Sequence, residues 1–307
     1  MLHTILSAMG PIIIGLLVGF ICGKKKYFSQ DTEKAFADFV VKIALPAALF
    51  VSAATVSPSI LLNVDYFLSL AAGLILTFII GLVIAKVIFK HNRRDGTVQA
   101  LTMSFPDMAY CGPPVLLATV GSTGLIAMVM GNLIYTVIIL PIAMMLLGEG
   151  QKNQSIGQTV WKSVYQPLVI LPILGAIISI SGIKLPNVFY NSVDELGKCA
   201  GGVALFFLGL MISHIKLKIN FEMICNIFIK NILQAVIILA VALGLGLEGG
   251  LLKSAFIIGI LPTATAVPAL AMSYKAYEED AAATVFLSTL CSLVTIVLGI
   301  IVIEMWL

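Results

Sequence analysis

The chain has 307 residues, of which 60% are hydrophobic and only 11% are charged, and its formal net charge is +3. Soluble domains carry about 25% charged residues, so this composition excludes a single water-soluble domain and predicts an integral membrane protein. The small net charge gives no support for nucleic-acid binding. The three histidines and five cysteines have no ligand spacing that would predict a metal site.

Ten apolar stretches follow one another along the chain, each near the length of about 20 residues that crosses a bilayer. They cover about 3–22, 35–55, 66–90, 97–120, 122–147, 164–181, 196–214, 223–246, 251–274 and 280–304. The first lacks a basic leader and an obvious cleavage site, so we interpret it as a retained span. We therefore predict an all-α protein of ten transmembrane helices.

The loops between these stretches alternate in positive charge. One set carries 14 lysines and arginines and the other set carries three. Basic loops are retained in the cytoplasm, so we expect a multi-pass protein of the plasma or inner membrane with both termini outside. The polar stretch 148–163 is predicted to be a cytoplasmic linker between residues 1–147 and 164–307.

The two halves of the chain match at an offset of 156 residues. The informative matches are those of prolines and charged residues: Pro11 with Pro167, Asp38 with Asp194, Lys42 with Lys198, and Pro106 with Pro262. Gly19 also matches Gly175, and Ala48-Leu49-Phe50 matches Ala204-Leu205-Phe206, but apolar identities carry little weight in so apolar a sequence. Each half holds five spans, an odd number, so the second half enters the membrane from the opposite face. This pattern predicts a 5+5 inverted repeat.

Two of the predicted spans contain helix-breaking residues near their middle. The span 97–120 contains Pro106, Asp107, Tyr110, Gly112, Pro113 and Pro114, and the span 251–274 contains Pro262, Thr263, Thr265 and Pro268. Proline removes a backbone donor. In lipid, the freed backbone groups are tolerated only where protein or a water-filled cavity satisfies them. A matched pair of broken spans therefore predicts a binding site at their crossover near the midplane.

Asp107 is the sharpest single candidate in the first break. An acid at mid-span costs ~2.5–3.5 kcal/mol on insertion scales, so it should face a cavity or a partner. It could bind a coupling cation, carry a proton or contact the substrate; alternatively it pairs with the free amides of the break. Gly112, Pro113 and Pro114 would begin the second half-helix, whose amides can hold a carboxylate.

Other polar residues have both a functional and a structural interpretation. The hydroxyls of Thr263 and Thr265 could contact a ligand, although membrane threonines often bond their own backbone. Asn132 could line the site or join neighbouring helices. Lys42 could meet a substrate carboxylate, or simply form an i,i+4 ion pair with Asp38.

The string Phe-Pro-Asp-Met-Ala-Tyr-Cys-Gly-Pro-Pro at 105–114 resembles the fourth-helix crossover of the auxin efflux carrier family. That family includes plant PIN-type carriers and bacterial malate and malonate permeases. Residues 262–274 resemble its ninth-helix crossover, and the Ser-Thr-Leu-Cys-Ser string at 288–292 resembles its tenth helix. One departure is that Asp107 stands where the family has asparagine.

The resemblance implies a fold similar to sodium/bile-acid symporters. A scaffold of helices 1, 2, 6 and 7 would form a homodimer, and a transport domain of helices 3–5 and 8–10 would move as an elevator. It also implies a carboxylate substrate: auxin-like weak acids in plants, malate or malonate in bacteria.

We therefore expect a secondary transporter of a small organic anion. H+ and Na+ are the candidate coupling ions, and no cofactor is expected. The alternative is a cation/proton exchanger of similar fold that uses Asp107. An enzyme is not expected, because the sequence carries neither a P-loop nor the motifs of intramembrane proteases.

Overall fold

The computed structural model describes residues 2–55, 58, 63–108, 111–121, 124–148, 165, 167–214 and 219–306. Within these residues every regular element is a helix, and the one β-type pairing is an isolated bridge between Pro106 and Thr263. The all-α prediction is therefore confirmed. Most of the predicted linker 148–163 lies outside the described residues.

In the first half of the chain the helices run in the following order. They are α1 (Leu2–Lys24), α2 (Gln30–Phe39), η1 (Val40–Ala44), α3 (Leu45–Thr55), α5 (Val64–Val87), α6 (Arg93–Ser104), α7 (Gly112–Thr119), α8 (Leu125–Ile134), η3 (Tyr135–Ile139) and α9 (Leu140–Leu147). The η elements are single π-helical turns, and each continues the helix on both sides of it.

The second half follows the same order of long and broken helices. Its elements are α11 (Pro167–Ser181), α12 (Asn187–His214), α13 (Phe221–Phe228), η4 (Ile229–Leu233), α14 (Gln234–Gly244), α15 (Gly249–Ile260), α16 (Ala266–Tyr274) and α17 (Glu278–Trp306). A third π-helical turn, η4, interrupts the helix from α13 to α14. Such turns are often found at functional sites.

Five helices among the described residues are long and apolar enough to cross a membrane, and the bent helix 278–303 would be a sixth. The five are Asp31–Thr55, Val64–Val87, Met130–Leu147, Asn187–His214 and Phe221–Gly244. The number is smaller than the predicted ten for two reasons. Stretches 97–120 and 251–274 are broken helices, and within the described residues the first and sixth stretches contribute the shorter apolar segments Ile13–Lys24 and Ile170–Ser181. A multi-pass membrane protein is supported, and the ten-span count stays a prediction.

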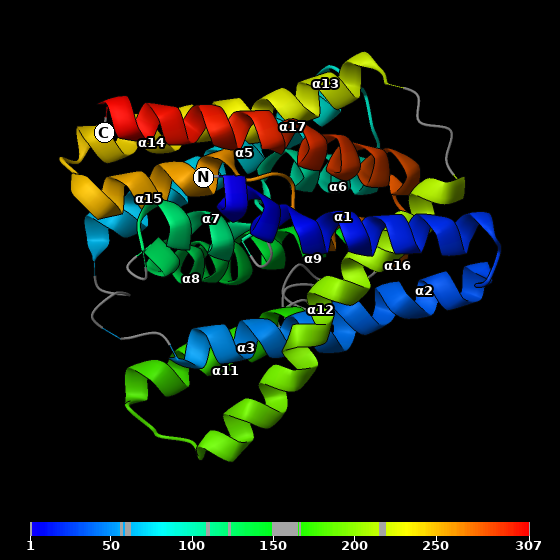
Figure 1. Ribbon diagram of the computed structural model, residues 1–307, viewed down its shortest axis with the longest axis horizontal. Helices are drawn as coiled ribbons and strands as arrows, with labels where there is room; N and C mark the ends of the chain where they lie inside the picture. The colour runs from blue at the N-terminus through cyan, green and yellow to red at the C-terminus, as the bar shows by residue number, and fades with distance from the viewer. Residues whose placement is uncertain are drawn as a thin grey trace, which may run out of the picture.

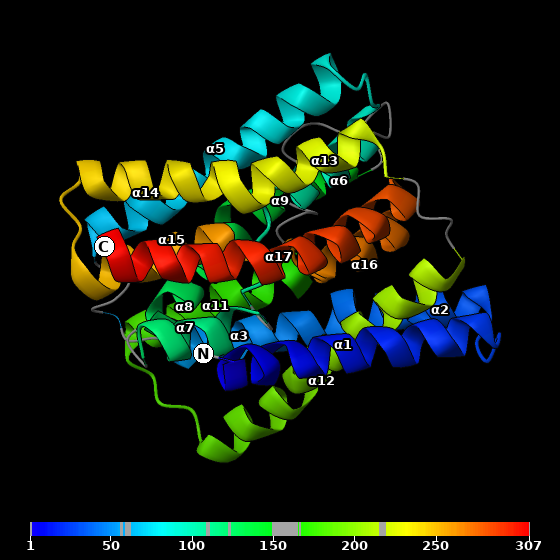
Figure 2. The same cartoon turned by 45° about the horizontal axis from the view of Figure 1, so that its top comes forward.

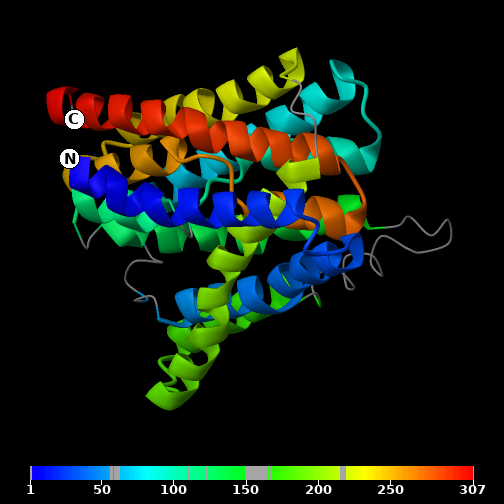
Figure 3. The same cartoon turned by 45° about the vertical axis from the view of Figure 1, so that its right-hand side comes forward.

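The helices form two groups. In one group α1 packs along α12, and α3 packs along both α11 and α12. In the other, α5 packs on α6 and α14, while α15 packs on α14 and α17. Figure 1 shows α3, α11 and α12 at the bottom and α5, α13, α14 and α17 at the top. The turned view in Figure 2 shows α1 running close to α12. Both termini lie towards the same end of the molecule (Figure 3).

Glycines set the closest helix contacts in the first group. A Cβ atom added to Gly19 of α1 would lie 2.0 Å from the carbonyl oxygen of Phe206 in α12. A Cβ atom added to Gly175 of α11 would lie 2.5 Å from the carbonyl oxygen of Phe50 in α3. The absence of a side chain lets the two backbones approach, as is common in membrane interfaces. The two contacts join residues that are related by the 156-residue offset.

Candidate functional site

The prolines of the fourth and ninth predicted spans lie at or beside two helix breaks. The helix α6 ends at Ser104 and α7 begins at Gly112, while α15 ends at Ile260 and α16 begins at Ala266. Pro106 lies in the first break and Pro262 in the second. Because proline cannot donate a backbone hydrogen bond, a continuous helix would be destabilised at both positions.

The two breaks meet and pair with each other. The backbone N–H of Asp107 donates to the carbonyl oxygen of Pro262 at 2.8 Å, and the N–H of Ala264 donates to the carbonyl oxygen of Phe105 at 2.8 Å. These bonds form the antiparallel bridge between Pro106 and Thr263. The chain therefore satisfies part of the backbone that both breaks leave unpaired, as burial in a membrane requires.

The remaining prolines lie at the starts of the second half-helices. Pro113 and Pro114 follow Gly112 in the first turn of α7. Pro268, which we expected inside the second break, instead lies in the first turn of α16. Proline suits this position because the N–H groups of a first turn have no partner within the helix. Pro268 thus starts a helix, as Pro113 does.

Thr263 and Thr265 have different surroundings although they are two residues apart. The Thr263 hydroxyl donates to the carbonyl oxygen of Thr102 at 2.8 Å, and its backbone N–H donates to Ser288 Oγ at 3.0 Å. It is fully buried and lies outside the neighbouring cavity. Thr263 therefore joins the second break to α6 and α17, whereas the structural interpretation from the sequence was a bond to its own helix backbone.

An aromatic stack fixes the entry to the first break. The rings of Phe105 and Tyr135 are stacked, with centroids 3.8 Å apart and planes 13° apart. The hydroxyls of Tyr135 and Ser104 lie 3.0 Å apart in a hydrogen bond. Tyr135 is the first residue of η3, so the π-helical turn presents this ring to the break.

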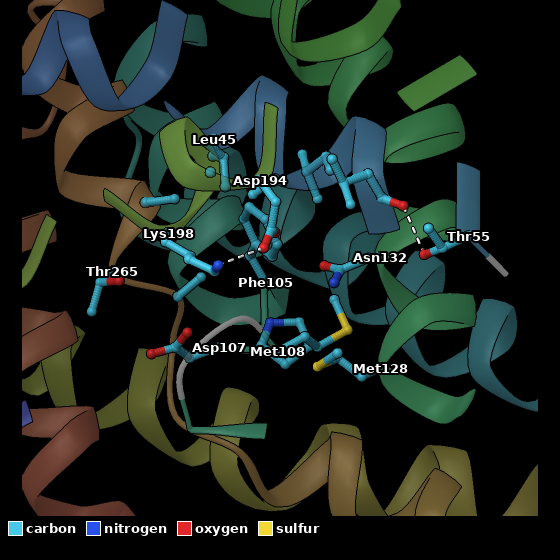
Figure 4. A pocket seen from close by; sticks show the side chains of 17 residues that line it. Leu45, Thr55, Phe105, Asp107, Met108, Met128, Asn132, Asp194, Lys198 and Thr265 are labelled. Atoms are coloured by element: carbon cyan, nitrogen blue, oxygen red, sulfur yellow. Dashed lines mark hydrogen bonds and ion pairs between the residues drawn. The ribbon is translucent and has the colours of Figure 1, made fainter. Parts of the chain in front are cut away.

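A cavity of about 540 Å³ lies beside the paired breaks. Its walls come from both groups of helices: α3 and α12 on one side, and the two breaks, α8 and the start of α16 on the other (Figure 4). Four predicted site residues line it together: Pro106, Asp107, Asn132 and Thr265. The structure therefore brings polar residues from both halves of the sequence to one place.

Two polar residues that line this cavity beside the breaks are almost fully buried. Asp107 is 2% exposed and Thr265 is 1% exposed. Among the described residues the Thr265 hydroxyl has no hydrogen-bond partner. A buried hydroxyl without a partner is costly, so a ligand that bonds to it would gain from doing so. Thr265 also precedes α16, whose first residue, Ala266, lines the cavity.

The charged wall of the cavity is contributed by Lys198 rather than by Lys42. Lys42 lies 3.0 Å from Asp38, as the i,i+4 spacing predicted, and it does not line the cavity. Its counterpart in the second half, Lys198, lines the cavity and lies 3.0 Å from Asp194. The 156-residue repeat contained this signal, because it paired Lys42 with Lys198, but it did not tell which lysine faces the breaks.

Of the four other predicted substrate-binding residues in the first break and in α7, the structure places only Gly112 relative to the cavity. Gly112 is buried, donates its N–H to the carbonyl oxygen of Asp107 at 3.0 Å, and does not line the cavity. Tyr110 lies outside the described residues. The side chains of Pro113 and Pro114 are also outside them. Sequence reasoning missed two apolar residues that line the cavity, Met108 and Met128.

Comparison with known proteins agrees with this geometry. The model of a family described as "Membrane transport protein" matches residues 4–300, nearly the whole chain. This chain belongs to that family. The family is of the auxin efflux carrier type, so the resemblance inferred from the crossover strings is confirmed.

Curated relatives of this membrane transport protein are transporters and a signaling protein. The uncharacterized transporter YfdV of Escherichia coli K12 is 29% identical over 96% of both chains. A putative malonate transporter of Rhizobium meliloti is 23% identical over 84% of this chain and 83% of its own. The lysosomal cholesterol signaling protein of Mus musculus is 25% identical over 90% of this chain but only 35% of its own. The chain is a multi-pass membrane transporter, and its family is one of transporters rather than enzymes.

Proposed function

We propose that this transporter moves a small organic anion, a mono- or dicarboxylate, through the cavity beside the paired breaks. One observation carries the proposal: the buried hydroxyl of Thr265 and the start of α16 line a cavity that Lys198 also lines. Helix N-termini attract carboxylates through free N–H groups and the positive end of the helix dipole. The substrate named for the Rhizobium meliloti relative, malonate, belongs to this chemical class.

The donors suit a carboxylate at the start of α16. The hydroxyl of Thr265 and the side-chain amide of Asn132 can each donate a hydrogen bond. The Lys198 ammonium adds a positive charge on the opposite wall, where it lies 3.0 Å from Asp194 and 2.8 Å from Glu195. A dicarboxylate could use both walls, which would join the two groups of helices through the substrate.

Asp107 determines how this site treats an anion. An ionised carboxylate 2% exposed in the cavity wall would repel the substrate, whereas a protonated one can donate a hydrogen bond. We therefore infer that Asp107 binds a proton when the anion binds, which couples transport to pH. The same buried acid favours a second candidate function, a cation/proton exchanger.

The wider architecture belongs to the same proposal. We infer a 5+5 inverted repeat in which α1, α2–α3, α11 and α12 form a scaffold and the remaining helices form a moving domain. Two observations support it: the matched glycine contacts of α1 with α12 and of α11 with α3, and the position of the cavity between the two groups. An elevator motion and a homodimer through the scaffold follow from the family resemblance, and termini outside the cell follow from the distribution of lysine and arginine over the loops.

Counterflow in proteoliposomes tests the proposed function. Vesicles loaded with unlabelled malonate, malate or a monocarboxylate should accumulate the labelled acid, and the accumulation should change with pH. Proton or sodium fluxes that occur without any carboxylate, and no counterflow with any acid of the panel, would instead favour the exchanger.

A further inference from the structure

Lys230 is a basic residue that lies in the interior of the protein. It lies in η4, in the middle of the apolar helix Phe221–Gly244, and its side chain is fully buried. The 14 basic residues counted in the cytoplasmic loops include Lys230, and the structure corrects that assignment. A lysine at this depth is expensive in a membrane and therefore indicates a function.

The Lys230 side chain is bonded to the end of a broken helix. Its Nζ donates to the carbonyl oxygen of Leu261 at 2.7 Å and to that of Gly259 at 3.3 Å. These carbonyls lie at the C-terminal end of α15, directly before the second break. The last carbonyls of a helix have no partner within it, and they form the negative end of its dipole.

The other broken helix ends in the same way. The side-chain amide of Gln234 donates to the carbonyl oxygen of Ser104 at 2.8 Å and to Thr77 Oγ1 at 2.8 Å. Ser104 is the last residue of α6, directly before the first break, and Gln234 is fully buried. Lys230 and Gln234 are four residues apart on one continuous helix, so a single helix supplies both donors.

These carbonyls are the type of ligand that coupling ions use. In secondary transporters with broken helices, unwound carbonyls and the C-terminal ends of half-helices coordinate Na+. A carbonyl oxygen that accepts a hydrogen bond from a tethered buried donor is no longer open to an ion.

We propose that Lys230, with Gln234, takes the place of coupling cations at the two broken-helix ends, so that the transport cycle is independent of Na+. The inference deepens the proposed function, because it names the coupling ion that the site does not use. Anion transport would then be coupled to the proton that Asp107 binds.

Thermal unfolding in detergent tests the inference without any substrate. The wild-type protein should unfold at the same temperature in sodium, potassium and choline chloride of equal ionic strength. The variant Lys230→Ala removes the donor. The carbonyls of α15 would then face the space that the lysine side chain had filled. Sodium should then raise the midpoint of this variant by at least about 3 °C relative to choline. The matched control is Lys253→Ala, a partly exposed lysine of α15, which should stay insensitive.

Two results would overturn the inference: a sodium-dependent midpoint in the wild-type protein, or a folded Lys230→Ala variant that does not respond to sodium. If Lys230→Ala does not fold, Gln234→Ala replaces it with the same expected sodium response, and no response would count against the proposal. In either case, a wild-type unfolding temperature that differs between sodium and choline chloride would overturn the inference. Because no carboxylate is present, a failure of counterflow would overturn the proposed function and leave these results unaffected.

Discussion

At the scale of single residues, the proposed transport of an anion depends on which polar side chains reach the cavity. Thr265 lines it and Thr263 does not, although both lie in the same break. Lys198 lines it and Lys42 does not, although both form an i,i+4 ion pair with an aspartate. These two contrasts provide matched pairs for mutagenesis.

Replacing Asp107 by asparagine should remove the pH dependence of transport. Asparagine keeps the size and the ability to donate a hydrogen bond but cannot exchange a proton. We expect substrate uptake by Asp107→Asn to be nearly equal across acid and neutral pH, whereas the wild-type rate should vary several-fold. Uptake by reconstituted protein measured over this pH range checks it, and a variant that keeps the wild-type pH profile would remove Asp107 from coupling.

Replacing Lys198 by alanine should weaken substrate binding. We expect the KM to rise by roughly 3–10-fold with a smaller change in kcat, because the lysine contributes to binding in the ground state. Lys42→Ala is the control, since Lys42 has the same 60% side-chain exposure and the same type of ion pair. Equal effects of the two variants on KM would contradict the assignment of the charged wall to Lys198.

At the scale of elements, the sequence predicted the breaks well and the rotation of the helices poorly. Prolines and an acid within apolar spans are strong signals, so the sequence alone locates both breaks. Lys230 lies inside the predicted stretch 223–246, but the count of basic residues assigns it to a loop, so its burial is not evident from the sequence. Which face of α12 meets the breaks depends on packing between distant helices, and the sequence carries little information about that.

The contacts between α1 and α12 and between α11 and α3 should respond alike to substitution. In Gly19→Ala and Gly175→Ala the new methyl group would meet a backbone carbonyl of the neighbouring helix. Such overpacking costs about 1–3 kcal/mol, so both variants should unfold at a lower temperature than the wild type. In contrast, Gly202→Ala in α12 should be nearly neutral, because its added methyl would meet nothing within 4 Å. Thermal unfolding compares the three, and a loss confined to one of the two contacts would argue against an equivalent role in a repeat.

At the scale of the whole molecule, the paired breaks lie where the two groups of helices face each other. The cavity has walls from both groups, so a relative movement of the groups would change its shape and its access to the two sides of the membrane. The paired backbone between Asp107 and Pro262 would move as one unit with the second group. In the proposed function, the substrate site would therefore lie at the interface between the two groups.

The central claim is that the two breaks and α12 enclose the carboxylate site, and a structure determined with malonate present tests it most directly. We predict density for the anion beside Thr265 and Asn132 and facing Lys198, with α6 and α15 still broken where they are now. Density for the anion elsewhere in the protein, or an unbroken helix in place of either break, would contradict the account.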